Sequence, residues 1–342
     1  MYIVGVSGIN AVDNPGPGLG IAKSLKESSL KLSIVGLAYD PMEPGIYTKW
    51  LIDKSFLMPL PSEGEKAFID RLLYIKANYG LDAVIPALDA ELLLFIKNAS
   101  FLNSSGIKTF LPTEEQFKFR RKDHLPEIAN AIGVKVPKTR SVTSYEELNN
   151  AVQELGFPVM IKGIFYKAYK AFNISQATSF FDSIVSEWGY PVIIQEVVNG
   201  EEMNVVGIGD GEGGHFGLVG IKKLWITSLG KIWTGVTIKN EKLLSATERF
   251  VYEFKWRGAF EFECIVNEED IYLIEINPRF PAWVYFATGV GVNLPERLLK
   301  AILGLEPERD CDYPIGKIYI RFTDDFVTDI SQFQTIVIKG EV

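Results

Sequence analysis

Two glutamates spaced twelve residues apart are the feature of this sequence that most clearly suggests chemistry. Glu263 and Glu275 lie in the apolar segments 260–266 and 271–276, which have the pattern of two strands joined by the polar turn 267–270. An antiparallel hairpin with that register brings the two carboxylates close together. Neighbouring carboxylates repel each other unless a positive charge lies beside them, so this hairpin is a candidate cation site.

Asn277 and Arg279 continue the same pattern. Side chains alternate between the two faces of a strand, so these residues share the face of Glu275. The apolar neighbours Leu273 and Ile276 indicate a partly buried strand, where an unpaired charge is costly. The alternative is a hairpin whose acids simply face water. A hard cation held by a few protein oxygens and by phosphates, such as Mg²⁺, explains the acids better.

Composition is that of an ordinary globular protein. The chain has 342 residues, of which 47% are hydrophobic and 23% charged, enough for two or three packed units. The net charge of −8 offers no basic field to attract nucleic acid. Cys264 and Cys311 match no zinc spacing and are too few for a disulfide framework, which favours a reducing compartment. With no apolar leader and no apolar run of about 18 residues, we predict a soluble, cytoplasmic protein without a membrane partner.

Three units are predicted along the chain. Residues 1–112 alternate strand and helix signals, which is typical of a parallel sheet covered on both faces. Residues 113–198 begin with a helical linker and continue with repeated strand, helix, strand patterns. Residues 199–342 combine antiparallel strands, helices and the acidic hairpin in an α+β unit. Further strands are expected at 108–111, 317–322 and 335–339.

Local signals in the second unit mark helix ends. Gly133 is expected to stop a helix that includes part of the linker. Ser144, with Glu147 three residues later, has the pattern of a capping box at the start of another helix.

Two lysines are candidates for binding an anion. Lys162 ends an apolar strand, where an ammonium group is desolvated unless it meets an anion. A lysine that reaches from the strand end to water is the alternative. Lys122 lies beside Arg120 and Arg121, and a basic run of this kind is usually a solvated face.

The segment EINPR, preceded twelve residues earlier by a strand glutamate, resembles the metal-binding signature of the ATP-grasp superfamily, in particular the branch similar to carbamoyl phosphate synthase and biotin carboxylase. The resemblance extends over about residues 1–310. It implies a Rossmann-like pre-ATP-grasp domain at 1–112, a linker helix with a lid subdomain at 113–198, and a C-terminal catalytic subdomain at 199–342.

The resemblance also implies cofactors and the residues that hold them. The cofactors are ATP with Mg²⁺, or Mn²⁺ in its place, and the metal ligands would be Glu263, Glu275 and Asn277. Lys122 and Lys162 would contact phosphates. The remaining implied ATP contacts are Gln195 through its amide, Glu196 and Val198 through main-chain groups at the adenine, Glu202 at the ribose, and Lys222 at the triphosphate.

Several of these assignments have alternatives. Glu201 is displaced by one position from Glu202 and could bind the ribose instead, or both could be exposed acids of a hairpin turn. Lys223 stands beside Lys222 at the end of the same expected strand, and either could face the triphosphate.

The lid departs from the family pattern. Many members have a glycine-rich loop after the lid lysine, whose backbone N–H groups hold phosphates. Here residues 163–167 read GIFYK, with a single glycine. Lys167 or Lys170 would then supply charge, or the lid closes only on a bulky substrate, or the chain is a catalytically weak relative.

On the acceptor side, the resemblance places Asp89 and Glu91 at a strand end over the cleft. Helix N-capping by Asp89 is an equal alternative. Trp283, with Tyr285 and Phe286, follows the metal signature and would line an acceptor pocket or pack in the core.

A glycine-rich segment in the first unit is not a dinucleotide fingerprint. In residues 14–20, NPGPGLG, the glycines alternate with other residues and two prolines interrupt them. A dehydrogenase is therefore the weakest option.

Together these features predict an ATP- and Mg²⁺-dependent ligase that activates a small-molecule or peptide carboxylate as an acyl phosphate for attack by an amine or thiol, releasing ADP and phosphate. Arg279 and Lys162 are its candidate catalytic residues. One alternative is a nucleotide-binding module without catalysis, such as a peptide-maturation partner. Another is bicarbonate activation like that of carbamoyl phosphate synthase, which pairs two such units. The resemblance also allows a homodimer.

Overall fold

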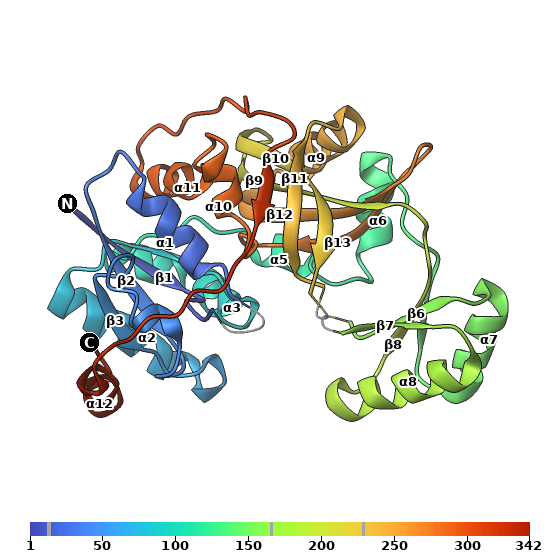
Figure 1. Ribbon diagram of the computed structural model, residues 1–342, viewed down its shortest axis with the longest axis horizontal. Coiled ribbons are helices and arrows are strands. Elements are labelled where there is room, and N and C mark those ends of the chain that lie inside the picture. Colours follow the sequence, from blue (N-terminus) through green and yellow to red (C-terminus); the bar gives the residue numbers. More distant parts are fainter. Residues whose placement is uncertain (12–14, 165–166, 228–229) are drawn as a thin grey trace.

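The computed structural model describes residues 1–11, 15–164, 167–227 and 230–342. These residues form three sheets, called first, second and third in chain order. In the ribbon view the first sheet lies on the left, the third in the middle and the second on the right (Figure 1). Residues 165 and 166 of the expected lid loop lie outside the described residues. Within the described ranges, no helix is both long enough and apolar enough to cross a bilayer.

The first sheet is parallel and has the strand order β3-β2-β1-β4. Its central strands are apolar along most of their length because helices cover the sheet. This agrees with the parallel arrangement expected from the alternating strand and helix signals. Its elements are β1 (Tyr2–Ser7), α1 (Gly18–Lys26), β2 (Leu32–Ala38), η1 (Pro44–Ile46), β3 (Lys54–Leu57), η2 (Pro61–Glu63), α2 (Glu65–Tyr79), β4 (Ala83–Ile85), α3 (Asp89–Lys97) and α4 (Ala99–Ser104).

The strand expected at 108–111 does not form. Lys108 makes only an isolated parallel bridge with Ala83, and the chain then leaves the first sheet. The ring of Phe110 packs against the guanidinium of Arg257, 3.9 Å from the ring centre. The segment therefore connects the first sheet to the third instead of extending the first.

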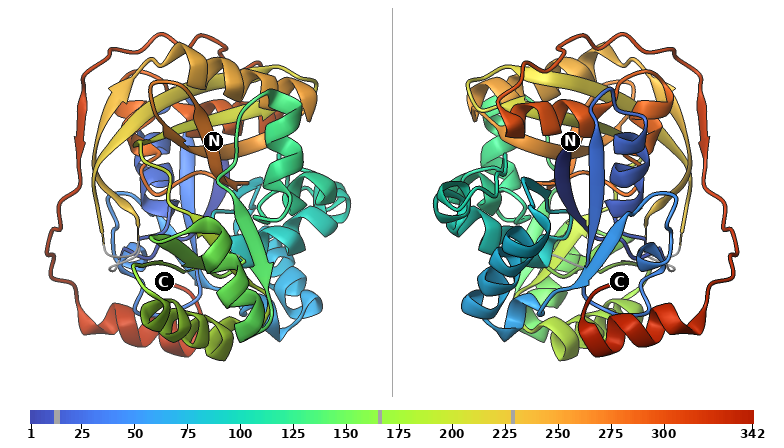
Figure 2. Two further views of the ribbon diagram at one scale, coloured as in Figure 1. Left: turned by 90° about the vertical axis from the view of Figure 1, so that its right-hand side faces the viewer. Right: turned by 90° about the vertical axis from the view of Figure 1, so that its left-hand side faces the viewer.

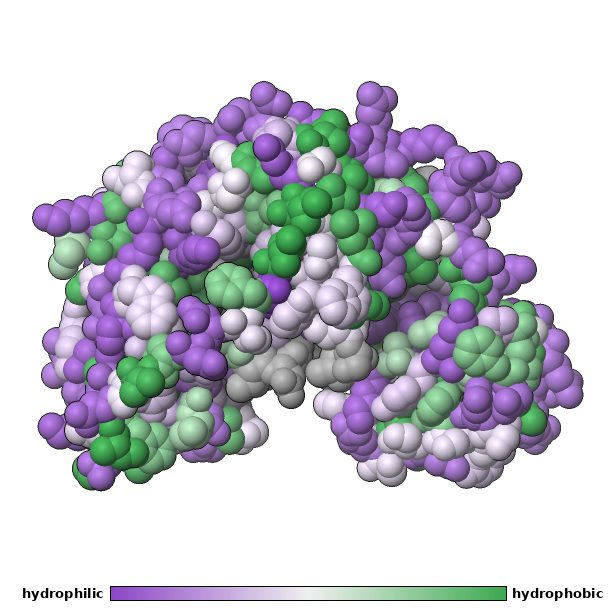
Figure 3. Space-filling model, in the orientation of Figure 1, coloured by the Kyte–Doolittle hydropathy of each residue, from purple (hydrophilic) through white to green (hydrophobic). Residues whose placement is uncertain are grey.

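The second sheet is a small antiparallel unit with the order β5-β8-β6-β7. Two helices pack on it and enclose a hydrophobic cluster that lies entirely within residues 142–194. In the space-filling view this unit stands apart from the first one (Figure 3). Its elements are β5 (Thr139–Val142), α7 (Tyr145–Leu155), β6 (Val159–Lys162), β7 (Ala168–Ala171), α8 (Ile174–Trp188) and β8 (Val192–Glu196).

The expected helix ends are present with one difference. Gly133 adopts a left-handed conformation (φ 70°) and ends α6 (Leu125–Ile132), as predicted. The Ser144 side chain accepts a hydrogen bond from the N–H of Glu147 at the start of α7. The Glu147 carboxylate, however, accepts from the backbone N–H of Thr143, one residue earlier than a capping box requires.

The third sheet is antiparallel and has the order β13-β12-β9-β10-β11-β14. Helices α6 and α9 pack on one face around Phe250, Phe260 and Phe262, and α11 covers the other. This sheet carries the acidic hairpin. Its elements and the helices around it are α5 (Glu114–Lys118), α6, β9 (Glu201–Asp210), β10 (His215–Ile226), β11 (Ile232–Ile238), α9 (Glu241–Glu253), β12 (Arg257–Val266), β13 (Ile271–Asn277), α10 (Tyr285–Gly289), α11 (Leu294–Leu303) and β14 (Ile318–Ile320).

The C-terminal segment differs from expectation. The strand expected at 317–322 is present as β14, but the one expected at 335–339 is part of a helix, α12 (Ile330–Lys339). The side views show the chain running along the outside of the molecule to reach this helix (Figure 2). Val342 then pairs through its backbone with Ser55 on the edge strand β3.

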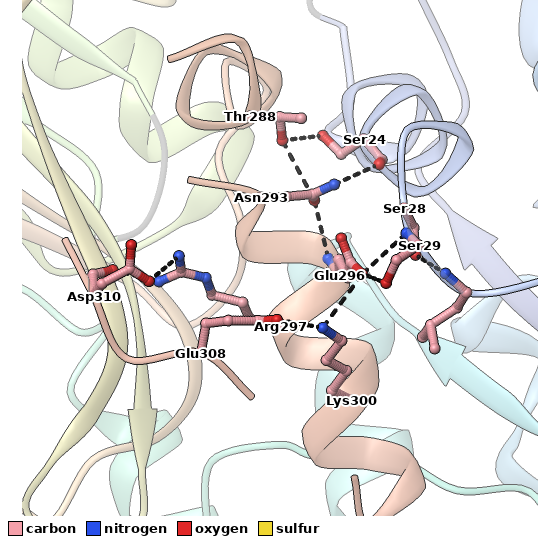
Figure 4. Close-up of polar contacts among 11 residues, drawn as sticks. Ser24, Ser28, Ser29, Thr288, Asn293, Glu296, Arg297, Lys300, Glu308 and Asp310 are labelled. Carbon is pink, nitrogen blue, oxygen red and sulfur yellow. Dashed lines mark hydrogen bonds and ion pairs between the residues drawn. The ribbon is translucent and has the colours of Figure 1, made fainter. Parts of the chain in front are cut away.

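Polar contacts join α1 to α10 and α11 (Figure 4). Asn293, at the start of α11, donates its Nδ2 to the carbonyl oxygen of Ser24 at 2.8 Å, and Thr288 donates to the Ser24 hydroxyl at 2.8 Å. Ser29 Oγ donates to the Glu296 carboxylate at 2.6 Å. One hydrophobic cluster contains residues of the first sheet together with residues of the third.

Candidate nucleotide and metal site

The acidic hairpin brings the two glutamates opposite each other, with a register shift between Glu263 and Cys264. Strands β12 and β13 pair so that Glu263 lies directly opposite Glu275 and Glu261 lies directly opposite Asn277. Residues directly opposite in an antiparallel pair point to the same face. The two carboxylates inferred from the sequence therefore lie together on the third sheet.

Lysines from two other elements compensate these carboxylates. On β10, Lys223 Nζ lies 2.7 Å from Glu263 Oε2 and 3.2 Å from Glu202 Oε2. Lys122, in the linker, places its Nζ 3.6 Å from Glu275 Oε1. Burial lowers the pKa of Lys223, but Glu263 and Glu202 outweigh burial and hold it above its ordinary value.

Lys223 in turn stabilises the negative charge of Glu263. Burial would raise the pKa of its carboxyl group, and the charge and hydrogen bond of Lys223 more than reverse that effect. Glu263 is therefore ionised although its side chain is only 12% exposed.

The structure does not bring Lys222, the lysine expected at the triphosphate, to the acidic hairpin. Lys222 Nζ pairs with Glu201, and its side chain is 31% exposed against 9% for Lys223. Adjacent residues of a strand point to opposite faces, so only one of the two lysines can reach the acids. The structure brings Lys223 and Glu202 to the hairpin and leaves Lys222 and Glu201 beside each other.

Asn277 and Arg279 extend the site toward the first sheet. Asn277 Nδ2 donates to Glu263 Oε1 at 3.0 Å, and its Oδ1 accepts from Arg279 at 3.3 Å. Arg279 also forms an ion pair with Asp89 at 2.9 Å, in which the side chains are 11% and 12% exposed. Burial raises the pKa of the Asp89 carboxyl, and Arg279 lowers it below its ordinary value. Asp89 is the first residue of α3 and follows the N-cap position, which Leu88 occupies.

Two residues expected to face a substrate are buried. Glu91 is 1% exposed and accepts hydrogen bonds from Ser7, from Tyr39 and from backbone N–H groups at the start of α3. Trp283 is 2% exposed, and its Nε1 donates to Glu261 Oε1 at 2.7 Å. Trp283 therefore packs in the core, which was the alternative to a place in an acceptor pocket. The carboxylate oxygens of Glu91 already accept hydrogen bonds from the protein itself.

The second sheet contributes Lys162 and Gln195. Lys162 Nζ donates to Gln195 Oε1 at 2.6 Å, and Gln195 Nε2 donates to Thr139 Oγ1 at 3.0 Å. Burial and the charge of Lys122 lower the pKa of Lys162 to about 8. Lys122 also contacts this unit, because its Nζ lies 3.4 Å from the carbonyl oxygen of Ile164. The two predicted phosphate lysines are thus close enough to influence each other.

Glu196 and Val198 follow on and after β8. The backbone N–H of Glu196 donates to the carbonyl oxygen of Lys138 at 2.9 Å, and its carboxylate accepts from the Lys138 N–H at 2.7 Å. Any main-chain contact of Glu196 with a ligand would therefore use its carbonyl oxygen. Val198 comes two residues after the end of this strand.

Sequence reasoning missed Glu261, Asn204 and Lys231. Glu261 is 5% exposed and accepts from Asn204 Nδ2 at 2.8 Å. Burial and the charge of Glu263 raise the pKa of its carboxyl group. The alternation in FEFE was the available signal, because it places Glu261 on the face of Glu263. Lys231 is half-buried, and desolvation and the charge of Arg279 lower its pKa; no local pattern marks it.

These oxygen donors suit a hard cation that takes its other ligands from phosphates and water. Among the described residues, no three His, Cys, Asp or Glu side chains are grouped as a complete metal site. The predicted set has only two carboxylates and one amide, and both carboxylates already have cationic neighbours. Such a partial set fits a metal that arrives with a nucleotide.

Comparison with known proteins shows what this chain is similar to. Residues 124–282 match the family model of the ATP-grasp domain. The chain is also similar to the carbamoyl phosphate synthase large chains of Clostridium botulinum, at 23% identity over 61% of this chain, and Clostridium perfringens, at 25% identity over 77%. The chain spans only 21% and 25% of the length of these two relatives.

Solved structures show the same fold over most of the chain. The biotin carboxylase domain dimer of Hydrogenobacter thermophilus 2-oxoglutarate carboxylase, in complex with MgADP, ADP and bicarbonate, has a TM-score of 0.69 at 16% identity, covering 93% of this chain and 73% of that one. An ADP complex of N5-carboxyaminoimidazole ribonucleotide synthetase has a TM-score of 0.67 at 16% identity, covering 91% and 79%. The L-amino acid ligase of Bacillus licheniformis has a TM-score of 0.64 at 14% identity, covering 90% and 75%. The resemblance drawn from the EINPR hairpin is confirmed.

Proposed function

We propose that this chain, which carries an ATP-grasp domain within a mixed α/β ATP-grasp fold, is an ATP- and Mg²⁺-dependent ligase. A substrate carboxylate would attack the γ-phosphorus of ATP, forming an acyl phosphate and releasing ADP. An amine or thiol would then attack the acyl carbon and release phosphate. The observation that carries this proposal is the pair Glu263 and Glu275, directly opposite each other and met by lysines from other elements.

The proposed domains follow the sheets except at two places, because α6 packs on the third sheet and Val342 pairs with β3 of the first. Residues 1–112 would be a Rossmann-like pre-ATP-grasp domain, which the parallel first sheet supports. Residues 113–198 would be the linker helix and lid, supported by the separate hydrophobic cluster of the second sheet. Residues 199–342 would be the catalytic subdomain that carries the hairpin.

Glu263, Glu275 and Asn277 would hold Mg²⁺, or Mn²⁺ in its place. The bound metal would neutralise charge on the phosphates during phosphoryl transfer. For an incoming nucleotide to bind here, Lys122 and Lys223 must exchange carboxylate partners for phosphate oxygens. Their distances of 3.6 Å and 2.7 Å from the acids support this exchange.

The remaining contacts would position the nucleotide and the acyl group. Lys162 would hold phosphate oxygens from the lid, and Gln195, which accepts its hydrogen bond, would fix its direction. Arg279 would stabilise negative charge on the migrating group or on the tetrahedral species, with Asp89 holding the guanidinium in place. The adenine and ribose contacts that we propose are Glu196 and Val198 through main chain, and Glu202 through its carboxylate.

The acceptor side, the assembly and the location are also proposals. The substrate would be a small-molecule or peptide carboxylate, brought close to Arg279. One similar structure is described as a dimer, which supports a homodimer. Both cysteines are free, which suits a reducing, cytoplasmic setting.

Two other functions have specific support. A nucleotide-binding module without catalysis is favoured by the lid loop, which has one glycine in residues 163–167. Bicarbonate activation is favoured by the similarity to carbamoyl phosphate synthase large chains, although the chain spans about a quarter of their length or less.

A two-stage experiment tests the proposal. Thermal stability is measured with Mg·ATP, and ADP release is then measured with amino acids, peptides and bicarbonate, each with and without an added amine. We expect stabilisation by Mg·ATP and ADP release that requires both an acid and a nucleophile. Release with bicarbonate alone would favour bicarbonate activation, and binding without release across the panel would favour the module. Absence of binding would refute all three.

A further inference from the structure

We propose that Glu261 is a positioning residue that sets the orientation of the Asn277 amide and so presents its carbonyl oxygen to the cation. This inference rests on the proposed function, because it concerns how a metal would be held. Glu261 lies directly opposite Asn277 in the hairpin, two residues before Glu263 on β12.

The Glu261 carboxylate is surrounded by hydrogen-bond donors. Oε1 accepts from Asn204 Nδ2 at 2.8 Å and from Trp283 Nε1 at 2.7 Å. Oε2 accepts from Asn277 Nδ2 at 3.2 Å. Only 5% of Glu261 is exposed, so these three protein donors replace the water that would otherwise solvate its carboxylate. Glu261 is therefore better suited to orient its neighbours than to bind a cation itself.

Glu261 and Glu263 together determine which way the Asn277 amide faces. Asn277 Nδ2 donates to Glu261 Oε2 at 3.2 Å and to Glu263 Oε1 at 3.0 Å, which uses both hydrogens of the NH₂ group. The opposite orientation would put the amide oxygen against two carboxylate oxygens, which is repulsive. The carbonyl oxygen must then face the other side, where it accepts from Arg279 at 3.3 Å.

The position requires a carboxylate rather than an amide. A carboxylate accepts hydrogen bonds and donates none, whereas a glutamine would turn an NH₂ group toward at least one of three donors. The three hydrogen bonds to Glu261 therefore favour a side chain with two acceptor oxygens at this position.

Trp283 connects this network to the loop that follows the hairpin. It lies four residues after Arg279, and its only ring N–H is fixed by Glu261. One carboxylate therefore holds both a proposed metal ligand and the segment beyond Arg279. Partners of this kind, which orient metal ligands without touching the metal, typically change metal affinity by about 10- to 100-fold when they are removed.

The test measures Mn²⁺ binding in the presence of the non-hydrolysable analogue adenylyl imidodiphosphate, by electron paramagnetic resonance, in the full chain. We expect Glu261→Gln to weaken Mn²⁺ binding by about 10- to 100-fold. Binding of the analogue without metal, in EDTA, should be unchanged. Glu261→Asp keeps the charge but shortens the reach to Asn277, and it should also weaken Mn²⁺ binding.

A double-mutant cycle with Asn277→Ala shows whether Glu261 acts through Asn277. In the Asn277→Ala background, Glu261→Gln should weaken Mn²⁺ binding no further, because both substitutions remove the same contribution of the Asn277 amide. An equal loss in both backgrounds would overturn the inference, and so would unchanged affinity in Glu261→Gln or in Glu261→Asp.

A matched control removes another buried carboxylate, which lies in the first unit and not on the hairpin. Glu43 is 9% exposed and accepts from the backbone N–H of Tyr39 at 2.7 Å in the first unit. Glu43→Gln should leave Mn²⁺ affinity at the wild-type value; a loss equal to that of Glu261→Gln would show a general effect of destabilisation and overturn the inference. Failure of the wild type to bind Mn²⁺ with the analogue would instead refute the proposed function.

Discussion

At the scale of single residues, substitution of Glu275 should affect catalysis more than nucleotide binding. Glu275→Gln keeps the shape of the side chain and removes its charge, so the proposed metal loses a ligand charge while the adenine, ribose and lysine contacts remain. We expect turnover to fall by about 100-fold or more, and nucleotide affinity to fall much less. ADP release and calorimetric titration measure the two effects. Wild-type turnover in this variant would refute the assignment.

Adjacent lysines on β10 provide a matched pair for stability. Lys223 forms an ion pair with Glu263 in which the side chains are 9% and 12% exposed, whereas Lys222 and Glu201 are 31% and 52% exposed. Lys223→Met leaves a buried charge without its partner and should lower the free energy of unfolding by about 3–5 kcal/mol. Lys222→Met should cost about 1 kcal/mol or less. Urea denaturation measures both, and equal losses would contradict the placement of Lys223.

Lys162 gives nucleotide binding a pH dependence. Burial and Lys122 lower its pKa to about 8, so the ammonium is charged below that pH and loses its proton as the pH rises through it. Affinity for ATP should therefore fall above about pH 8, and binding there should take up protons. Lys162→Arg keeps its charge over this range and should flatten the profile. Parallel profiles from calorimetry in the two proteins would contradict this role.

The sequence predicted the paired acids but not all of their neighbours. Strand alternation and a short turn indicated Glu263 and Glu275 as neighbours. Their direct pairing also depends on a register shift between Glu263 and Cys264, which no local pattern specifies. Which of Lys222 and Lys223 contacts the hairpin acids could not be predicted, because it depends on how β10 faces β12 across β9, which no local pattern specifies. Glu261 was missed although it alternates with Glu263, because its donors come from distant segments.

At the scale of elements, the C-terminal helix shows tertiary contacts overriding local propensity. Residues 335–339, TIVIK, are rich in β-branched residues, which favour strands. In the structure they belong to α12, where Asp329 accepts from the N–H of Ser331 at the start and Gly340 ends the helix with φ 70°. Helical spacing puts Ile336 in the core and leaves Ile338 80% exposed. The strand pattern alone could not show that Ile336 is buried and Ile338 is not.

Those two isoleucines test how α12 is held. Ile336→Ala removes a fully buried side chain and should cost about 2 kcal/mol or more, with faster protease cleavage in the segment before α12. Ile338→Ala removes an exposed side chain from the same helix and should have little effect on either measurement. Equal cleavage rates in the two variants would show that packing of Ile336 does not anchor the helix.

At the scale of the whole molecule, the hydrophobic clusters define how its parts are coupled. One cluster combines strands of the first sheet with strands and helices of the third, and the polar contacts between α1 and α11 reinforce it (Figure 4). The cluster of the second sheet stays within residues 142–194. The strand and helix patterns predicted the separate sheets, but contacts between distant segments, which those patterns do not encode, determine which sheets share a core.

We therefore expect two cooperative units, the second sheet and the rest of the molecule. Asn293→Ala removes the cap of α11 and the bond to Ser24, and should cost about 0.5–2 kcal/mol. Hydrogen exchange measured by mass spectrometry in low denaturant should then rise in the first and third sheets together and stay unchanged in the second. Phe181→Ala, in the core of the second sheet, should have the reverse pattern. If either substitution accelerated exchange in all three sheets equally, the molecule would open as one unit, and the second sheet could not move as a lid without loosening the acidic hairpin.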